Sequence, residues 1–204
     1  MKRTLFGLTA AALLTGTASA DLFITEYMAD PDDLADSDGE YFEVYNSGAP
    51  INISDLTISD DGDESIDLVG QSGVIGTGEF FVFGRSAQSY VDFNYGVIGG
   101  YFLANGQDEI VISLTAGGDE LARVVWTDGD DFGDGVANEL VDITLGSSTV
   151  GRDGGTDYTA ATSAGIAGST DLGSPGAAGN TVIPEPTSLA LLGLGGLLVA
   201  RRRR

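Results

Sequence analysis

The middle of the chain alternates apolar and polar residues with a period of two, and glycine and aspartate interrupt this pattern frequently. Such alternation is typical of β-strands that bury one face. It predicts strands at residues 22–28, 41–46, 56–59, 65–69, 79–84, 109–114, 121–127 and 140–145. We find no convincing amphipathic helix here, and the 31 glycines suit many tight turns. Seven or eight short strands predict an all-β sandwich.

The second predicted strand illustrates the pattern. Phe42 and Val44 fall on one face, and Tyr41, Glu43 and Tyr45 fall on the other. Because side chains of a strand point alternately to its two sides, the apolar pair is expected to face the core.

The composition changes after about residue 146. From there to residue 183 the chain is rich in Gly, Ser, Thr and Ala and has few large apolar residues. This composition predicts a loosely packed end of the domain that continues as a flexible stalk.

The first 20 residues have the three parts of a secretory signal peptide. Lys2 and Arg3 form a basic start, residues 5–14 are apolar, and residues 18–20 read Ala-Ser-Ala. Small residues in this arrangement specify cleavage, which we expect after Ala20. The sequence therefore predicts an exported protein with a body at residues 21–180.

The C-terminal end carries a second apolar segment. Residues 187–200 form a short apolar run that predicts a membrane helix, and four arginines follow it, Arg201, Arg202, Arg203 and Arg204. A helix of this length rises only about 20 Å, less than the ~30 Å hydrocarbon core, so local thinning or snorkelling must help it to span. Arginine clusters stay on the cytoplasmic side, which places the body outside the inner membrane.

Residues 183–204 resemble the PEP-CTERM sorting signal of Gram-negative bacteria. The resemblance rests on Pro184, Glu185 and Pro186, the short Gly/Leu/Ala helix and the terminal arginines, in this order. It implies processing near the tripeptide by exosortase, a transpeptidase-like membrane enzyme, and a transient stay in the inner membrane. The two prolines suit such processing because they keep the backbone extended.

The body between the two ends is strongly acidic. Residues 21–183 hold three basic residues, all arginines, against thirty acidic ones, a net charge of −27. Such a surface repels phosphates, so we expect no nucleic-acid partner. Divalent cations, cationic partners and neutral glycans are the ligands that such a charge permits. The alternative is that the charge serves only to keep the protein soluble in a salty environment.

The chain has neither cysteine nor histidine. Disulfides and zinc or copper sites of the usual kind are therefore excluded, as are nucleophilic sites built on Cys or on Ser with His. Asp and Glu alone suit hard cations such as calcium.

The body resembles the lamin tail domain. The resemblance follows six blocks in order, at residues 23–31, 39–48, 53–60, 78–85, 103–112 and 172–180. The third block departs from the family pattern, with Asp55 and Thr57 where Gly and a Trp-like residue are expected. The resemblance implies an immunoglobulin-like β-sandwich that serves as a binding or scaffold module and brings no shared catalytic machinery.

Two acidic stretches are candidate calcium loops, because closely spaced carboxylates supply the six to eight oxygens that calcium prefers. Solvated acidic loops are the alternative interpretation, and a third stretch at residues 60–64 is first of all a hairpin turn. The candidate ligands are Asp30, Asp32, Asp33, Asp36 and Asp38 in the first stretch, and Asp128, Asp130, Asp134 and Glu139 in the second.

Other chemistry has weaker support. Glu26, Glu40 and Glu43 invite a glycosidase interpretation with paired carboxylates, but nothing fixes their separation, and glutamates on an exposed strand face are common. Exposed aromatics such as Tyr41, Tyr45 and Tyr90 are candidates for stacking on sugars, although such residues more often cover sheet edges.

We therefore expect a non-enzymatic, exported protein of the cell surface or extracellular matrix. Exopolysaccharide and surface proteins are its candidate partners. A carbohydrate-binding module of the exopolysaccharide matrix is the first alternative, and an exported hydrolase is the second.

Overall fold

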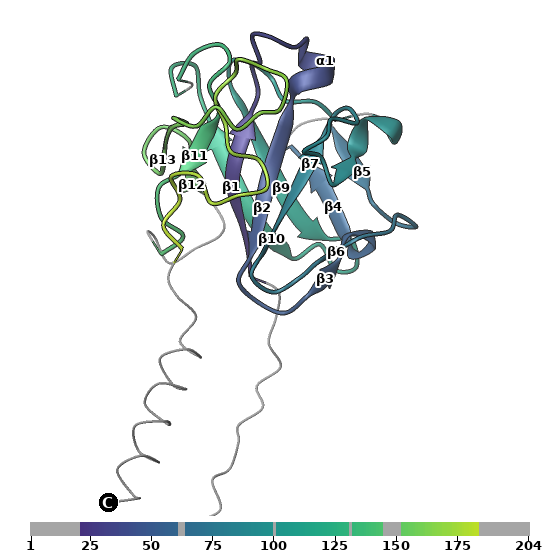
Figure 1. Ribbon diagram of the computed structural model, residues 1–204. Coiled ribbons are helices and arrows are strands. Elements are labelled where there is room, and N and C mark those ends of the chain that lie inside the picture. The colour runs from purple at the N-terminus through teal and green to yellow at the C-terminus, as the bar shows by residue number, and fades with distance from the viewer. Residues whose placement is uncertain (1–20, 61–63, 100, 131, 145–151, 184–204) are drawn as a thin grey trace, which may run out of the picture.

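Two β-sheets packed face to face form the body of the protein (Figure 1). The computed structural model describes residues 21–60, 64–99, 101–130, 132–144 and 152–183. The predicted signal peptide (1–20), the tripeptide Pro184, Glu185 and Pro186, the predicted membrane helix (187–200) and the arginines 201–204 lie outside the described residues. Within the described part, no helix is long and apolar enough to cross a membrane.

The larger sheet has the strand order β13-β11-β1-β2-β7-β8. Its pairs are antiparallel except for the parallel pair of β7 with β8. Its strands are β1 (Leu22–Met28), β2 (Tyr41–Asn46), β7 (Glu79–Gly84), β8 (Phe93–Asn94), β11 (Asn138–Leu140) and β13 (Tyr158–Ala160).

The smaller sheet has the order β12-β10-β9-β4-β5, with β12 parallel to β10 and the other pairs antiparallel. Its strands are β4 (Leu56–Ser59), β5 (Ser65–Asp67), β9 (Asp108–Leu114), β10 (Glu120–Trp126) and β12 (Arg152–Asp153). A two-stranded ribbon, β3 (Ile51–Asn52) with β6 (Val74–Ile75), and the short helices α1 (Asp36–Gly39), η1 (Ile53–Asp55) and η2 (Tyr95–Val97) complete the described elements.

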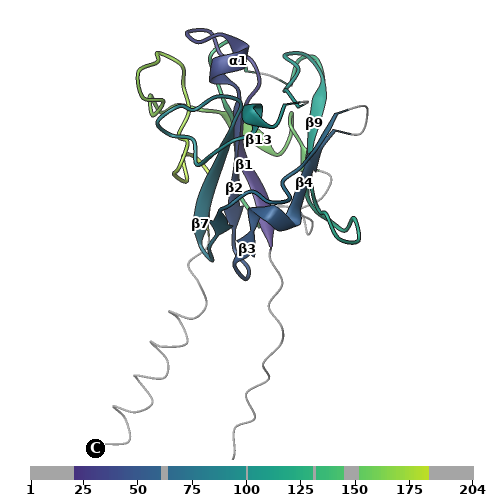
Figure 2. The ribbon, with the colours of Figure 1, turned by 90° about the vertical axis from the view of Figure 1, so that its right-hand side faces the viewer.

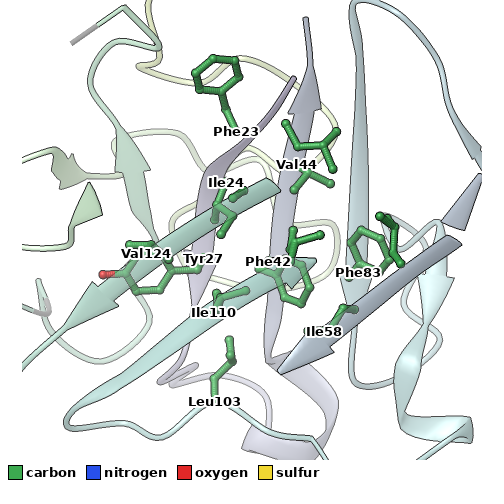
Figure 3. Close-up of a cluster of buried hydrophobic side chains, with 14 of the residues drawn as sticks. Phe23, Ile24, Tyr27, Phe42, Val44, Ile58, Phe83, Leu103, Ile110 and Val124 are labelled. Carbon is green, nitrogen blue, oxygen red and sulfur yellow. The ribbon is translucent and has the colours of Figure 1, made fainter. Parts of the chain in front are cut away.

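The main core lies between the two sheets. Phe42 and Val44 of the larger sheet and Ile58, Ile110 and Val124 of the smaller one are fully buried in it, as Figure 3 shows. The alternation in the sequence therefore predicted the inward face of β2 correctly. Apolar burial of this kind is the dominant favourable term in folding.

A break in register changes the alternation along β1. The pairing of β1 with β2 shifts between Ile24 and Glu26. Ile24 and Tyr27 both belong to the main core, whereas Thr25 donates its hydroxyl proton to the Glu43 carboxylate at 2.6 Å. A bulge inserts one residue into a strand and re-aims the side chains beyond it. Glu26 consequently lies across from Glu43 on the outer side of the sheet, away from the main core.

A third layer covers this outer side. Residues 161–183, which we call the C-terminal strap, lie on the side of β1 and β2 opposite to β4 and β9 (Figure 2). A second apolar cluster joins the strap to the sheet, and its buried members are Met28, Tyr41, Val82, Ala137, Ala161 and Ile166. The strap is therefore more closely packed than its Gly-, Ser- and Ala-rich composition predicts.

The last predicted strand, at residues 140–145, is displaced. The structure places β11 at Asn138–Leu140, and the residues after it pair with the strap. The Val182 amide donates to the Val141 carbonyl at 2.9 Å, and the Ile143 amide donates to the Val182 carbonyl at 3.3 Å. The end of the strap is therefore hydrogen-bonded to the body, and it lies at the same end of the sandwich as the start of β1 (Figure 1).

Candidate functional site

Three glutamates lie side by side beneath the strap. Glu139 of β11, Glu26 of β1 and Glu43 of β2 are direct neighbours across three adjacent strands. Each of the three is 1% exposed. We call these three residues the carboxylate clasp.

Main-chain amides of the strap bind the clasp. The Ser174 amide donates to Glu26 at 2.8 Å, the Gly176 amide donates to Glu43, and the Asn180 amide donates to Glu139 at 2.9 Å. The Ser174 hydroxyl also contacts Glu26 and Glu139, at 2.9 and 2.8 Å. Carboxylates that accept from backbone N–H groups form strong, charge-assisted hydrogen bonds.

Burial dominates the electrostatics of the clasp. It raises the pKa of Glu26 to about 7 and that of Glu43 to about 8, because desolvation penalises the carboxylate more than the hydrogen bonds favour it. The Tyr41 hydroxyl donates to Glu26. No arginine offsets the clasp charges among the described contacts, because Arg85, Arg123 and Arg152 bind elsewhere.

The environment of Glu26 and Glu43 argues against the glycosidase interpretation. That chemistry needs two carboxyl groups on either side of a sugar bond in an open site. Glu26 and Glu43 instead lie under the strap with their oxygens occupied by strap and sheet donors. The expectation of an exposed strand face was wrong for both, because the strap covers that face.

Glu40 serves a separate ion pair. It is 2% exposed, and burial raises its pKa to about 7. Arg85 at the end of β7 donates to it at 2.9 Å, and the Leu103 amide donates to it at 3.3 Å. A buried pair of this kind is costly to break, so Glu40 has a structural role.

The first candidate calcium stretch is a hydrogen-bonded loop at the end of the sandwich that carries α1, opposite the start of β1 (Figure 1). Asp30 accepts from the Asn105 side chain at 2.7 Å. Asp33 accepts from the Thr170 amide at 2.9 Å. Asp32, Asp36 and Asp38 are exposed, the last two in helix α1.

The second stretch is divided by the fold. Asp130 folds back onto Thr127, which donates its amide and hydroxyl to it at 2.8 and 2.7 Å. Asp128 and Asp134 are exposed, while Glu139 belongs to the clasp. Glu139 therefore does not join Asp128 and Asp130 as the sequence suggested, because it lies in strand β11 and faces the strap.

The two stretches meet at one point, where the Gly135 amide donates to the Asp30 carbonyl at 2.7 Å. Among the described residues, no group of three or more acidic side chains is arranged to hold a metal ion. Calcium binding stays a prediction for this end of the molecule.

Two of the three tyrosines considered for sugar stacking are covered, and the third, Tyr90, is half-buried and packs edge-on against Tyr41. Tyr41 is fully buried and Tyr45 is 8% exposed, so neither offers an open ring face. An open hollow of about 360 Å³ lies instead beside β9 and β10, lined by Asp60, Gln107, Asp108, Glu109, Val125, Trp126 and Thr127. Trp126 is only 1% exposed there and stacks on Tyr27 at 4.6 Å between ring centroids, so it packs in the core.

The two packed sheets define an immunoglobulin-like sandwich, and the strap covers one of its outer faces. Residues 15–128 match the family model of the Lamin Tail Domain, and residues 182–204 match that of the PEP-CTERM protein-sorting motif. The chain belongs to the lamin tail domain family. No curated protein and no solved structure matches it.

The sorting motif identifies an exported protein that exosortase sorts to the envelope or surface of a bacterium. The lamin tail match ends at residue 128, before the strap, which contains Ser174, and before one of the three clasp residues, Glu139. The sequence pattern does not predict the clasp, although the block at residues 172–180, which supplies strap donors to it, resembles the ending of the family.

Proposed function

We propose that the protein is a non-enzymatic component of the cell surface or extracellular matrix, and that its sandwich acts as a binding or scaffold module. One observation carries the proposal. The buried glutamates that a hydrolase would need are used to fasten the strap, with main-chain amides at 2.8 Å from Glu26 and 2.9 Å from Glu139. Membership of the lamin tail family and the sorting motif support it.

The strong negative charge of residues 21–183 limits the kinds of partner that the protein can bind. Residues 21–183 carry thirty acidic and three basic residues. Arg85 and Arg123 are paired with Glu40 and with Glu109 and Glu120. Cationic surface proteins and neutral exopolysaccharides are the partners that such a surface tolerates, since it repels polyanions.

The test uses the full chain in a bacterium that carries an exosortase. We expect the wild type in the surface and matrix fractions, with the tail removed, and Glu185→Ala retained in the membrane fraction with its tail. Cells that lack the protein should show weaker aggregation and matrix retention than complemented cells. Normal aggregation without the protein would contradict the proposed role in adhesion or matrix organisation.

Calcium is a further part of the proposal, as an aid to adhesion at the end that carries α1. Calorimetry of the purified protein with calcium chloride, against a chelated control, tests it. A saturable heat that Asp32→Asn and Asp134→Asn together abolish would support the site. The absence of heat, with no shift in melting temperature, would contradict it.

A further inference from the structure

The strap leaves no spacer between the folded body and the sorting motif. Val182 is hydrogen-bonded to Val141 and Ile143, and Ile183 packs against the main core. Pro184, the first residue of the tripeptide, follows Ile183 directly in the sequence. A chain fastened up to residue 183 thus offers a processing enzyme no free residue on the N-terminal side of the tripeptide.

Release of the strap would greatly increase the distance that the tripeptide can move away from the folded body. Residues 161–183, fully extended, span at most about 75 Å. The strap is fastened to the first strand of the sheet, since Ser174 binds Glu26, which lies 148 positions earlier in the sequence. Segments held by a few hydrogen bonds and a small apolar cluster open locally at a lower free energy than the whole domain.

A membrane enzyme that cleaves near the tripeptide must bind the chain on both sides of the bond. We propose that the carboxylate clasp controls sorting: the closed strap holds the chain to the body up to Ile183, and processing uses the fraction of molecules in which the strap has opened. Glu26, Glu43 and Glu139 then act as regulatory residues, far in sequence from the motif they control. The inference rests on the proposed processing of the tail by exosortase.

The strap offers variants that open the clasp without touching the motif. Ser174→Ala removes the hydroxyl that lies 2.9 Å from Glu26 and 2.8 Å from Glu139 and offers its single proton to them. At Gly173 an added Cβ would lie 2.6 Å from the Glu26 carboxylate, so Gly173→Ala must push the strap away from it. Thr170→Ala is the matched control, because it also removes a hydroxyl from the strap, but Thr170 is exposed and contacts Asp33 through its main-chain amide.

The experiment is a pulse–chase of the full chain in cells that carry exosortase, with the loss of the tail as the readout. Ser174→Ala should speed processing about tenfold, since the variant lacks a buried hydrogen bond from the strap to a carboxylate. Gly173→Ala should act in the same direction, and Thr170→Ala should process at the wild-type rate. Thermal unfolding of each purified variant verifies that the sandwich is folded.

A spacer tests the mechanism itself. Ten Gly/Ser residues inserted between Ile183 and Pro184 should speed processing as much as Ser174→Ala does. In the spacer background, Ser174→Ala should have no further effect, because the motif is already free of the body.

The experiment distinguishes a failure of the proposed control by the clasp from a failure of the proposed processing by exosortase. Equal rates for wild type, spacer and strap variants overturn the control by the clasp and leave exosortase sorting intact. Acceleration by Ser174→Ala that persists in the spacer background also overturns it. Retention of the tail in every variant, the same as in Glu185→Ala, contradicts the proposed processing.

Discussion

Ser174 is the residue at which strap and sheet are most closely joined. Its amide binds Glu26, and its hydroxyl bridges Glu26 and Glu139. It is 8% exposed, so water replaces these bonds poorly when they are lost. A buried acceptor that loses its donor costs about 1–3 kcal/mol.

We therefore predict that Ser174→Ala lowers the free energy of unfolding by about 1–2 kcal/mol. Urea denaturation of the purified protein measures this change. Ser65→Ala, an exposed serine of edge strand β5, is the control and should change stability by less than about 0.5 kcal/mol. Equal stability of Ser174→Ala and wild type would mean that the Ser174 hydroxyl contributes nothing to the fold.

A second residue-scale prediction concerns the pair of Glu40 with Arg85. Their side chains meet at 2.9 Å, with Glu40 almost fully buried and Arg85 about one third exposed. Arg85→Met keeps the apolar stem but leaves a buried carboxyl group alone, so we expect a loss of about 3 kcal/mol at neutral pH. The double variant Arg85→Met with Glu40→Gln should recover part of that loss, and denaturation of all three proteins shows whether it does.

At the scale of elements, the clasp makes the stability of the strap depend on pH. Burial raises the folded-state pKa of Glu26 to about 7 and of Glu43 to about 8, above the ordinary value of 4.5. Between pH 4.5 and 8 the folded protein therefore holds protons that the unfolded chain has released. Stability must then fall as pH rises through this window, and it levels off above it.

We predict a melting temperature at pH 8.5 that is at least about 4 °C below that at pH 5.5. Glu43→Gln should flatten this slope, since the amide cannot ionise. Glu79→Gln removes an exposed strand glutamate and should leave the slope unchanged. A melting temperature that rises over this range would refute the account of the clasp.

The elements also show what the sequence could predict. The bounds of β1, β2, β4 and β7 agree with those predicted from the alternation. In β1 the bulge interrupts the alternation, but apolar residues on both sides of it still face the main core. The strap escaped prediction because its contacts are main-chain hydrogen bonds made by small residues, which leave no apolar period. The clasp escaped for a related reason: the bulge after Ile24 re-aims Glu26, and burial by a segment distant in sequence leaves no local signal.

At the scale of the whole molecule, the charge opposes the compact state. Thirty acidic residues against three basic ones repel one another throughout residues 21–183. Salt screens this repulsion, since the Debye length shrinks from about 30 Å at 0.01 M to about 3 Å at 1 M.

We therefore predict that the melting temperature at pH 8 rises by about 5 °C or more when sodium chloride is raised from ~0.01 M to ~1 M. The rise should be smaller at pH 4.5, where many carboxylates are protonated. Scanning calorimetry at the two pH values makes the comparison. A salt effect of equal size at both would show that it does not come from the carboxylates.

The central claim is that the chain stays folded up to residue 183, with the strap fastened to the clasp. Hydrogen exchange of the folded protein tests it most directly. The account predicts slow exchange at the amides of Ser174, Gly176 and Asn180, which bind Glu26, Glu43 and Glu139. Exchange at the rate of an unfolded chain across residues 161–183, with strands β1 and β2 still protected, would contradict it.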